Sequence, residues 1–485
     1  MLMAGLDDRA ALAAAQDADT AAYERTPYPT LIHPSTHPDR LAVVARLVGM
    51  DPPDLRTARV LEVGVGNGFN LLAMAQPFPD ARFTGIDIDA LAIGVGQGWI
   101  EELGAHNVTL LPMDLLDAVD RLAGPFDYII AHGVYAWVPA PVAEALLALI
   151  GRLLAPQGVA CVSFNTLPGC YLRLALRDAM LRAIGDATDH DERMARARTA
   201  LERLAGPDGG DAPMRETVRK QAKETLARAD VGILIHDELN PNYTPAYLHE
   251  VIARAGVHGL DFLGDSSPEL ITEALLPRAV DPAANHQRQL EQLVCDGDEA
   301  DFCQFRRMLL VRAGAAPARV FSASNLSGLY AASDAVRHGV TFARGRRHVQ
   351  MPDPALGAAL DRLAAAWPGR LAVPDLGLDP DRLRALVDLS AHDMLALHSG
   401  PAPFATVQGA CPTASLLAAW MARAEMPWLA TLDHRVIKLD PVAVAALLVM
   451  DGKPDEGRLA AALAAGAMTS EQALTAMLNE ALFVA

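Results

Sequence analysis

Long apolar segments and paired cysteine motifs are missing from this 485-residue sequence. The apolar run from Val442 to Met450 is well below the roughly 20 residues that a membrane-spanning helix needs. Four aspartates and no basic segment lie between Met1 and Asp19, so we expect no secretory signal, no membrane insertion and a cytoplasmic location. The 5 cysteines form no Cys-x-x-Cys pair. We therefore expect reduced thiols and no metal site.

Positive charge is also scarce, and the formal net charge is −18. Binding to nucleic-acid phosphates depends on lysine and arginine, so the composition argues against a nucleic-acid partner. A basic protein, or a cationic segment of one, is a better electrostatic match. At 51% hydrophobic and 21% charged residues, the chain is typical of globular proteins and long enough for more than one domain.

Short β-branched runs alternate with helical patterns up to about residue 164. This alternation predicts an α/β fold with a doubly wound, Rossmann-like parallel sheet, in which ligands bind at the carboxyl ends of the strands. The predicted strands are 60–63, 82–86, 108–111, 126–131 and 159–164, and the predicted helices are 38–48, 69–76, 90–103, 115–122 and 140–154.

The remainder of the chain is mainly helical. A helical insertion is predicted near 170–229, and strands at 259–263 and 306–312 would add a final antiparallel pair to the sheet. A Gly-Ala-Ala-Pro linker precedes helices and a hairpin that suggest a winged-helix-like unit. We thus predict a core over 1–169, a region of insertion and regulation over 170–314, and a C-terminal domain over 318–485.

The strongest signal is a strand that breaks into three glycines and then a helix. Glycines in such a turn let backbone N–H groups approach a polar or anionic ligand closely. A dinucleotide loop would need a further glycine at position 69, which is Phe69 here. The Glu-x-Gly-x-Gly-x-Gly pattern is instead similar to motif I of class I S-adenosylmethionine methyltransferases, and a glycine turn without a ligand is the alternative. The residues concerned are Glu62, Gly64, Gly66, Asn67 and Gly68.

Two acidic residues follow the next two predicted strands. Asp87 lies 19 residues after Gly68, where a carboxylate can accept both hydroxyls of a ribose. Met113 and Asp114 end the third strand, where methyltransferases contact the adenine. Each carboxylate also fits a helix N-cap, so both interpretations stay open.

Acceptor candidates follow the fourth and fifth strands. The Asn/Asp-Pro-Pro-Tyr/Phe tetrapeptide of nucleobase and glutamine methylases is absent, which disfavours those acceptors. His132 is a candidate catalytic and cofactor-binding group, or an ordinary hydrogen-bonding histidine. Tyr135 and Trp137 would wall a channel for an amine, or simply pack. Asn165 would orient the acceptor, or only form a turn.

A second polar cluster lies around residues 236–245. A helix cap explains Thr244 and Pro245 but not the neighbouring polar side chains. We therefore include His236 and Tyr243 among the acceptor-binding candidates.

Several segments between residues 28 and 310 together resemble one family, the class I methyltransferases with a methyltransferase regulatory domain, including lysine methyltransferases of rickettsial outer-membrane proteins. The resemblance implies S-adenosyl-L-methionine as cofactor, Tyr28 as a further cofactor-binding residue, and a protein lysine as acceptor. The helix after Asp87 departs from the family in its three glycines at 94, 96 and 98. The segments are Tyr28-Pro29, Thr36 to Leu41, Glu62 to Gly68, His132 to Pro139, Asn165 to Gly169, His236 to Leu239, His258 to Leu263 and Phe305 to Leu310.

We therefore predict a methyltransferase that catalyses in-line transfer to a neutral nitrogen nucleophile. Every motif of the cofactor type precedes residue 170, so we expect the last domain to select the acceptor and not to hold the cofactor. A small-molecule N- or O-methyltransferase and a non-catalytic, cofactor-sensing interaction protein are the alternatives. A nicotinamide dehydrogenase ranks third because of Phe69.

Overall fold

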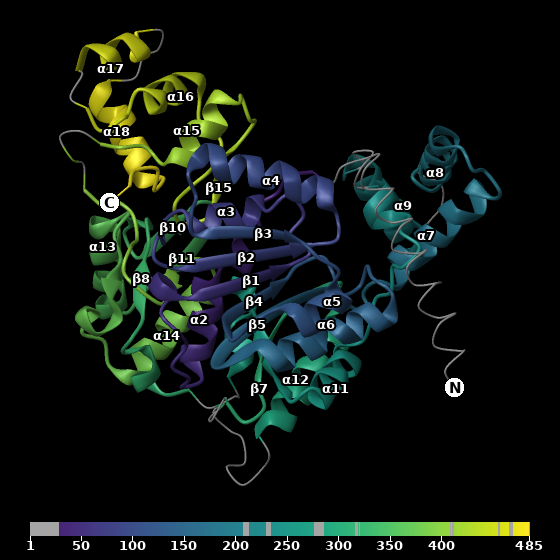
Figure 1. The fold of residues 1–485 in the computed structure, drawn as a ribbon. Coiled ribbons are helices and arrows are strands. Elements are labelled where there is room, and N and C mark those ends of the chain that lie inside the picture. The colour runs from purple at the N-terminus through teal and green to yellow at the C-terminus, as the bar shows by residue number, and fades with distance from the viewer. Residues whose placement is uncertain are drawn as a thin grey trace.

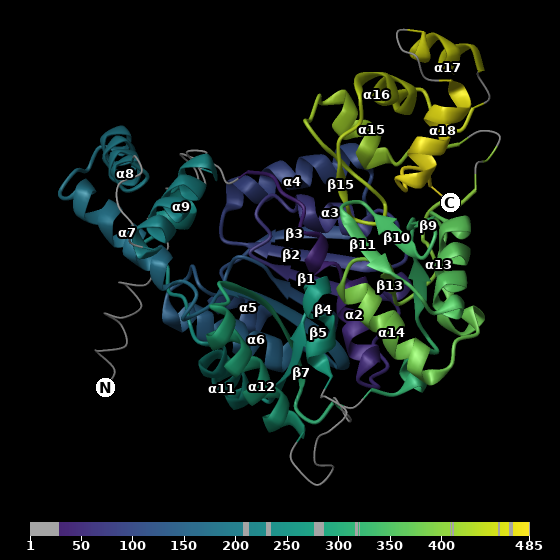
Figure 2. The same ribbon diagram turned by 180° about the vertical axis from the view of Figure 1, so that it is seen from behind.

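The computed structural model describes residues 29–206, 213–228, 234–275, 286–315, 319, 321–407, 409, 412–453, 456–464 and 469–484. A central sheet carries helices on both faces, a helical arm extends to one side, and the C-terminal part of the chain covers the opposite side (Figure 1). The view from behind shows the same arrangement (Figure 2).

The central sheet has seven strands in the order β3-β2-β1-β4-β5-β7-β6. The first five strands are parallel, and β7 is antiparallel to both β5 and β6. The predicted Rossmann-like sheet and its final antiparallel pair are thus confirmed. The strands are β1 (Arg59–Val63), β2 (Arg82–Asp87), β3 (Val108–Pro112), β4 (Phe126–Ala131), β5 (Leu154–Asn165), β6 (Leu260–Asp265) and β7 (Phe305–Arg312).

Each face of the sheet has its own apolar core. One core buries α2 (Pro38–Leu47), α3 (Phe69–Ala75) and α4 (Ala90–Leu103) against the sheet. The other core buries α5 (Leu115–Arg121), α6 (Ala140–Leu153), α11 (Leu248–Val257) and α12 (His286–Asp301). The sequence did not predict α12, whose mean hydropathy is low and which contains Gly297.

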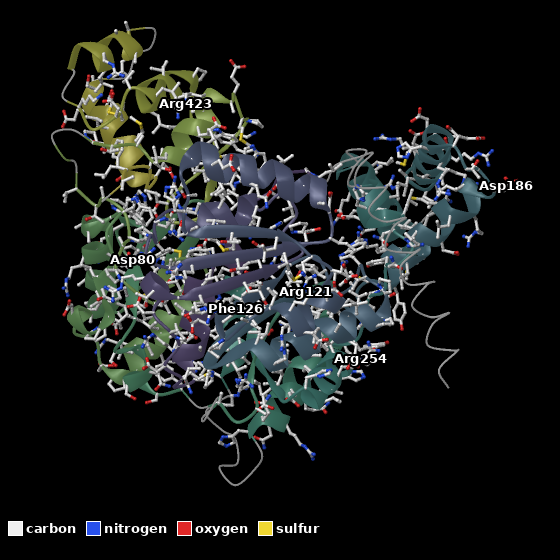
Figure 3. All side chains as sticks on the ribbon, in the orientation of Figure 1. Asp80, Arg121, Phe126, Asp186, Arg254 and Arg423 are labelled. Carbon is white, nitrogen blue, oxygen red and sulfur yellow. The ribbon has the colours of Figure 1, made fainter. Side chains whose placement is uncertain are left out.

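The arm consists of α7 (Tyr171–Ile184), α8 (His190–Leu204) and α9 (Pro213–Arg228), close to the predicted insertion. It has a small apolar core of its own, formed by residues such as Met180 and Leu201. Figure 3 places Asp186 on this arm, far from Phe126 in the sheet. The arm is therefore an appendage that begins at the carboxyl end of β5.

After β7 the chain forms a strand-rich unit, residues 321–407. Its two small sheets have the orders β11-β10-β9 and β12-β8-β13. The elements are β8 (Tyr330–Ala332), β9 (Val336–His338), β10 (Thr341–Arg344), β11 (Arg347–Gln350), α13 (Pro354–Ala366), β12 (Leu371–Ala372), α14 (Pro380–Ala391) and β13 (Ala396–His398).

The described residues of the C-terminal unit, residues 412–484, include four helices and a hairpin. Strands β14 and β15 pair antiparallel. The elements are α15 (Leu416–Arg423), β14 (Leu429–Ala430), β15 (Val436–Ile437), α16 (Pro441–Leu448), α17 (Glu456–Leu463) and α18 (Ser470–Asn479). Helical turns elsewhere are η1 (Pro34–Thr36), η2 (Leu55–Thr57), η3 (Leu234–Glu238), η4 (Pro268–Ala274), η5 (Ala323–Leu326) and η6 (Val373–Leu376).

These two units pack against the central domain and share most of their buried apolar residues with its core, apart from a small cluster of Phe404, Leu432 and Ala481. Phe342 and Leu417 belong to the same buried cluster as Leu71 of α3. Asp39 adds polar contacts, since it accepts hydrogen bonds from Ser399 N and Oγ at 2.7 and 2.6 Å and lies 2.7 Å from His398 Nδ1. This docking accounts for the Asp within the segment Thr36 to Leu41. The predicted domain boundary after the Gly-Ala-Ala-Pro linker stays a prediction.

No helix in the described part of the chain is both long and apolar enough to cross a membrane. Likewise, the described residues contain no group of three or more His, Cys, Asp or Glu side chains placed to hold a metal ion.

The shared core predicts the effect of truncation. Ending the chain after Gly314 would expose the apolar surface of α2, α3 and α4 that the later units bury. We expect the truncated protein to aggregate or to lose cooperative unfolding, as measured by calorimetry and light scattering. A truncated chain that melts cooperatively near the temperature of the full chain would contradict this expectation.

Candidate active site

The loop between β1 and α3 has the left-handed turns that favour glycine. Gly64, Gly66 and Gly68 have φ values of 70°, 55° and 75°. A Cβ at Gly64 would lie 2.4 Å from Val134 Cγ2, and one at Gly68 would lie 2.6 Å from Leu110 Cδ1. Around Gly66, in contrast, no described heavy atom lies within 4 Å of such a Cβ. Two glycines are thus required by packing, and the third faces open space.

Asp87 holds this loop in place. Its Oδ2 accepts a hydrogen bond from Gly66 N at 2.7 Å, and its Oδ1 accepts one from Asp89 N at 2.9 Å. Burial raises the pKa of the Asp87 carboxyl. The carboxylate therefore shapes the loop, and its contact with a ribose stays a prediction.

The other loop residues also have structural partners. Asn67 Nδ2 donates to Thr30 Oγ1 at 2.9 Å, while Asn67 Oδ1 accepts from Phe69 N at 3.2 Å. Met113 N donates to Asp87 O at 2.8 Å, which brings the ends of β2 and β3 together. Asp114 Oδ1 accepts from Leu116 N at 2.9 Å and caps α5. The cap interpretation of Asp114 is confirmed, and its adenine contact stays a prediction.

Glu62 is buried at the end of β1 with one oxygen unused. Its Oε1 accepts a hydrogen bond from Asn70 Nδ2 at 2.8 Å. Its Oε2 is buried and has no hydrogen-bond partner in the described chain. Burial raises the pKa of Glu62 to about 7. A buried carboxyl oxygen without a partner in the described chain fits a cationic group of a ligand.

His132 lies at the end of β4 beside a second histidine. Its ring centroid is 4.1 Å from that of His33 and 5.9 Å from that of Phe305. Burial, with the nearby His33 and Arg307, holds the pKa of His132 well below its usual value. Its Nδ1 is buried without a hydrogen-bond partner among the described residues. The imidazole is therefore neutral near pH 7.

Arg307 completes this group, and the sequence analysis did not single it out. Its guanidinium lies 5.0 Å from the centre of the Phe305 ring, and its Nη1 donates to Ser267 Oγ at 3.0 Å. Its charge contributes to lowering the pKa of both His33 and His132. Arg307 lies within the segment Phe305 to Leu310 that resembles the family. The sequence alone did not show which side of the strand its side chain faces, because that depends on the strand register.

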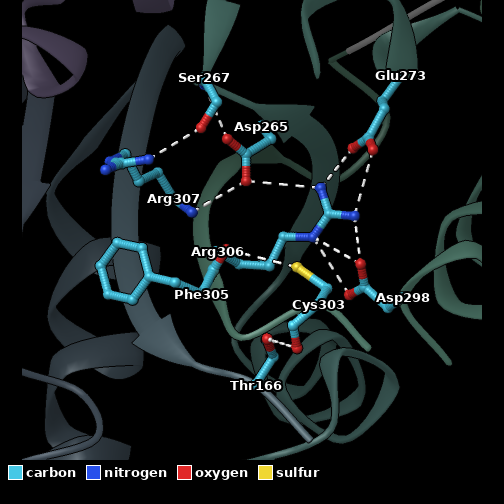
Figure 4. Close-up of polar contacts among 9 residues, drawn as sticks. All are labelled: Thr166, Asp265, Ser267, Glu273, Asp298, Cys303, Phe305, Arg306 and Arg307. Atoms are coloured by element: carbon cyan, nitrogen blue, oxygen red, sulfur yellow. Dashed lines mark hydrogen bonds and ion pairs between the residues drawn. The ribbon is translucent and has the colours of Figure 1, made fainter. Parts of the chain in front are cut away.

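A buried ion network fixes the start of β7 (Figure 4). Arg306 is only 3% exposed and pairs with Asp298 and with Glu273, whose Oε2 is 2.5 Å from Nη1. Asp265 Oδ2 lies 3.6 Å from Arg306 Nη1 and accepts a hydrogen bond from Arg307 N at 2.9 Å. Arg306 and Arg307 point to opposite sides of the strand. The network thereby directs Arg307 toward Ser267.

Asn165 ends β5 and is 6% exposed. It lies opposite Phe305 in the antiparallel ladder, and its backbone O accepts a hydrogen bond from Ala246 N at 3.1 Å. Its Oδ1 is buried without a partner in the part of the chain that the structure describes. The Cys170 thiol interacts with both Asn165 and Tyr243. Asn165 thus has an unused acceptor within the described chain, and its role in orienting the methyl acceptor stays a prediction.

Trp137, one of the two predicted channel residues, stacks with Tyr243 and not with Tyr135, and a cation already lies beside this pair. Trp137 and Tyr243 stack with their ring centroids 4.6 Å apart. The Arg173 guanidinium lies 5.4 Å from the Trp137 centroid and 4.9 Å from the Tyr243 centroid. Arg173 also forms a 3.0 Å ion pair with Glu238. An incoming ammonium would have to displace Arg173 or bind beside it.

The structure places the remaining candidates away from open surfaces. Tyr135 packs against Phe164 at 5.7 Å, and its hydroxyl lies 3.5 Å from Arg254 Nη1. His236 is 4% exposed. The catalytic role of Tyr135 and the acceptor-binding role of His236 stay predictions. Tyr28 lies outside the described residues.

Comparison with known proteins identifies the family. A methyltransferase domain matches residues 60–158, a predicted methyltransferase regulatory domain matches 230–312, and the C-terminal winged helix domain of PKMT proteins matches 411–480. RP028 of Rickettsia prowazekii is 33% identical over 235 residues, which are 48% of this chain and 93% of that protein. This chain belongs to the class I methyltransferases with a methyltransferase regulatory domain. Its cofactor is S-adenosyl-L-methionine.

Other relatives cover different shares of this methyltransferase. RP789 of Rickettsia prowazekii is 32% identical over 249 residues, 51% of this chain but only 45% of that protein. The fold is that of PKMT2 from Rickettsia typhi, with a TM-score of 0.78 and 22% identity. The match covers 95% of this chain and all of that one, and PKMT2 has also been solved with AdoHcy. The predicted winged-helix character of the C-terminal unit is confirmed.

The residues present fit the cofactor. The open face at Gly66 and the unpaired Glu62 Oε2 lie at the same strand end, as a donor with both polar and cationic groups requires. Glu62, the glycine loop, Asp87 and Asp114 would hold it. When bound, the cofactor supplies an electrophilic methyl group on a sulfonium.

Asp87 gives a first test of this site. Asp87→Ala removes the acceptor for Gly66 N and the predicted ribose contact, so affinity for S-adenosylmethionine and S-adenosylhomocysteine should fall equally. The loss of about 1.5 to 3 kcal/mol corresponds to roughly tenfold to beyond a hundredfold. Asp89→Ala, which removes only the cap of α4, is the matched control. Wild-type affinity of Asp87→Ala in calorimetry would refute the assignment.

Glu62 gives a pH-dependent test. With a pKa of about 7, the carboxyl is neutral at pH 6 and charged at pH 8. Affinity for the cationic donor should therefore rise with pH across this window, by up to about tenfold per unit below the pKa. Calorimetric titrations at several pH values should give a flat profile for Glu62→Gln. An equally steep profile in that variant would assign the effect to another group.

Proposed function

We propose that this methyltransferase transfers a methyl group to a lysine side chain of a protein. The observation that carries the proposal is a pair of buried polar atoms without partners in the described chain, His132 Nδ1 and Asn165 Oδ1, at neighbouring strand ends around Phe305. With its proton on Nε2, the neutral His132 ring offers Nδ1 as an acceptor there. A neutral primary amine has two N–H hydrogens to donate and one lone pair left for the methyl group. Two acceptors therefore suit a lysine amine in its reactive form.

Electrostatics support the same acceptor. A lysine must lose a proton before it can attack, and burial together with the positive charge of Arg307 lowers the pKa of an amine bound there. His132 has too low a pKa to store the released proton, so its contribution is to orient the amine. Alignment and exclusion of water would supply most of the acceleration.

Three further findings favour a protein lysine. The rings of Trp137 and Tyr243 favour a cation electrostatically, and an acceptor lysine would bind beside or in place of Arg173. The net charge of −18 favours a basic partner. The fold and the C-terminal winged helix are of the PKMT type.

The decisive experiment identifies the acceptor without assuming it. The full-length protein is incubated with isotopically labelled donor and a cell lysate, and the label is traced by mass spectrometry. Methyllysine in a discrete protein supports the proposal. Label confined to a metabolite would establish the small-molecule alternative, and tight donor binding without any labelled product would favour the cofactor-sensing alternative.

Substitutions at Asn165 and Tyr135 distinguish a side chain that orients the methyl acceptor from one that only packs. Asn165→Leu removes the free acceptor, so kcat/KM for the methyl acceptor should fall by about a hundredfold or more, while donor affinity changes less than about threefold. Tyr135→Phe keeps the contact with Phe164 and should retain most of the activity. Steady-state kinetics and donor calorimetry test both. Equal losses of donor affinity and turnover in Asn165→Leu would contradict the assigned role.

A further inference from the structure

The C-terminal unit inserts one residue into the central domain at the cofactor loop. His434 lies in the turn between β14 and β15 and is 1% exposed. Its φ of 61° is in the left-handed region, which is uncommon for residues other than glycine and recurs at functional positions. Two hydrogen bonds within the turn hold it there. His434 N donates to Thr431 O, and Thr431 N donates to Arg435 O, each at 3.0 Å.

The turn is fixed from the C-terminal side as well. Arg435, the next residue, pairs with Asp433 at 2.6 Å and with Glu480 at 2.9 Å. The surrounding structure thus maintains a backbone conformation that a histidine rarely adopts. The result is an imidazole aimed out of the C-terminal unit and into the central domain.

His434 contacts Asn70, in the first turn of α3. His434 Nε2 lies 3.1 Å from Asn70 Oδ1, which also accepts a hydrogen bond from His33 N at 2.8 Å. Since that amide oxygen only accepts, His434 Nε2 must be the donor. Burial, with His37, His33 and Arg40 nearby, holds the pKa of His434 well below its usual value, so the ring donates as the neutral form.

Asn70 passes this constraint to the cofactor-binding carboxyl. With its oxygen occupied by His434 and His33, its Nδ2 faces Glu62 and donates to Oε1 at 2.8 Å. The other carboxyl oxygen, Oε2, is the one without a partner in the described structure. A line of hydrogen bonds therefore runs from the C-terminal unit to Glu62, at the end of the strand that precedes the glycine loop.

We propose that His434 is a positioning residue of the S-adenosylmethionine site, which acts through Asn70 to aim Glu62 at the donor. The C-terminal unit then completes the cofactor site, although no cofactor motif occurs in its sequence. This inference depends on the cofactor and not on which acceptor is methylated.

The docking of the C-terminal unit does not depend on this hydrogen bond alone. Phe69 of α3 packs against Trp428 at 5.9 Å and against Trp420 at 6.3 Å. Ser415 Oγ also donates to Gln76 Oε1, at the other end of α3, at 2.5 Å. Gln76→Ala thus breaks a second contact between the C-terminal unit and α3. This contact is remote from Glu62, so the variant serves as a matched control.

The test compares two substitutions of His434 in the full-length protein, which introduce amide side chains of different length. His434→Asn suits a left-handed turn but is too short to reach Asn70, whereas His434→Gln can place an N–H near the position of Nε2. By calorimetry with S-adenosylhomocysteine, we expect His434→Asn to bind about five- to thirtyfold more weakly. His434→Gln should recover to within about threefold of wild type, and Gln76→Ala should stay within twofold.

Two outcomes would overturn the proposal. One is wild-type affinity in His434→Asn, and the other is an equal loss in Gln76→Ala, which would reduce the effect to weakened docking. Thermal unfolding of each variant shows that it is folded. If His434→Asn does not fold, Asn70→Ala, which breaks the same line at its centre, is measured instead and should weaken binding at least as much.

A double-mutant cycle tests the route through Glu62. In a Glu62→Gln background, His434→Asn should cause less than a twofold further loss of affinity, because there is no carboxylate left to aim. Retention of the full effect in that background would show that His434 acts on the donor by another route, and the proposal would fail.

Discussion

Burial of polar groups at the carboxyl edge of the sheet is the constraint on which this molecule depends. Glu62 Oε2, His132 Nδ1 and Asn165 Oδ1 are all buried without partners in the described structure. Each such group costs on the order of 1 to 3 kcal/mol relative to a paired one. A ligand that pairs with them regains this free energy. The same edge that is costly in the free protein is therefore well suited to bind a donor and an amine.

The antiparallel strand β7 determines which side chains lie beside the carboxyl edge of the sheet. In the antiparallel pair with β5, Arg307 lies opposite Ser163 and Phe305 lies opposite Asn165. The ion network of Arg306 anchors the start of the strand, because three carboxylates converge on one buried guanidinium. The segment that matches the regulatory domain therefore places Phe305 and Arg307 beside the strand ends, where the acceptor is proposed to bind, and it also covers the end of the sheet.

Much of the fold could be predicted from local patterns. The period of β-branched and helical runs located the first five strands and their helices, and the coincidence of Glu62, three glycines and a following helix identified the cofactor. Local patterns failed where packing decides. Helix α12 was missed because its mean hydropathy is low, and no local pattern signals that Phe342 and Leu417 join the core of α3. Neither feature is visible within a window of one element.

The sequence by itself determined the family, the cofactor loop and the polar residues at the strand ends, because these follow from residue type and short spacing. Tertiary structure alone decided how those residues are used. Arg173 fills the aromatic pair of Trp137 and Tyr243, Arg307 joins the two histidines, and His434 reaches Asn70 from 364 positions away. Such contacts depend on strand register and on the docking of distant units, which no short stretch of sequence encodes.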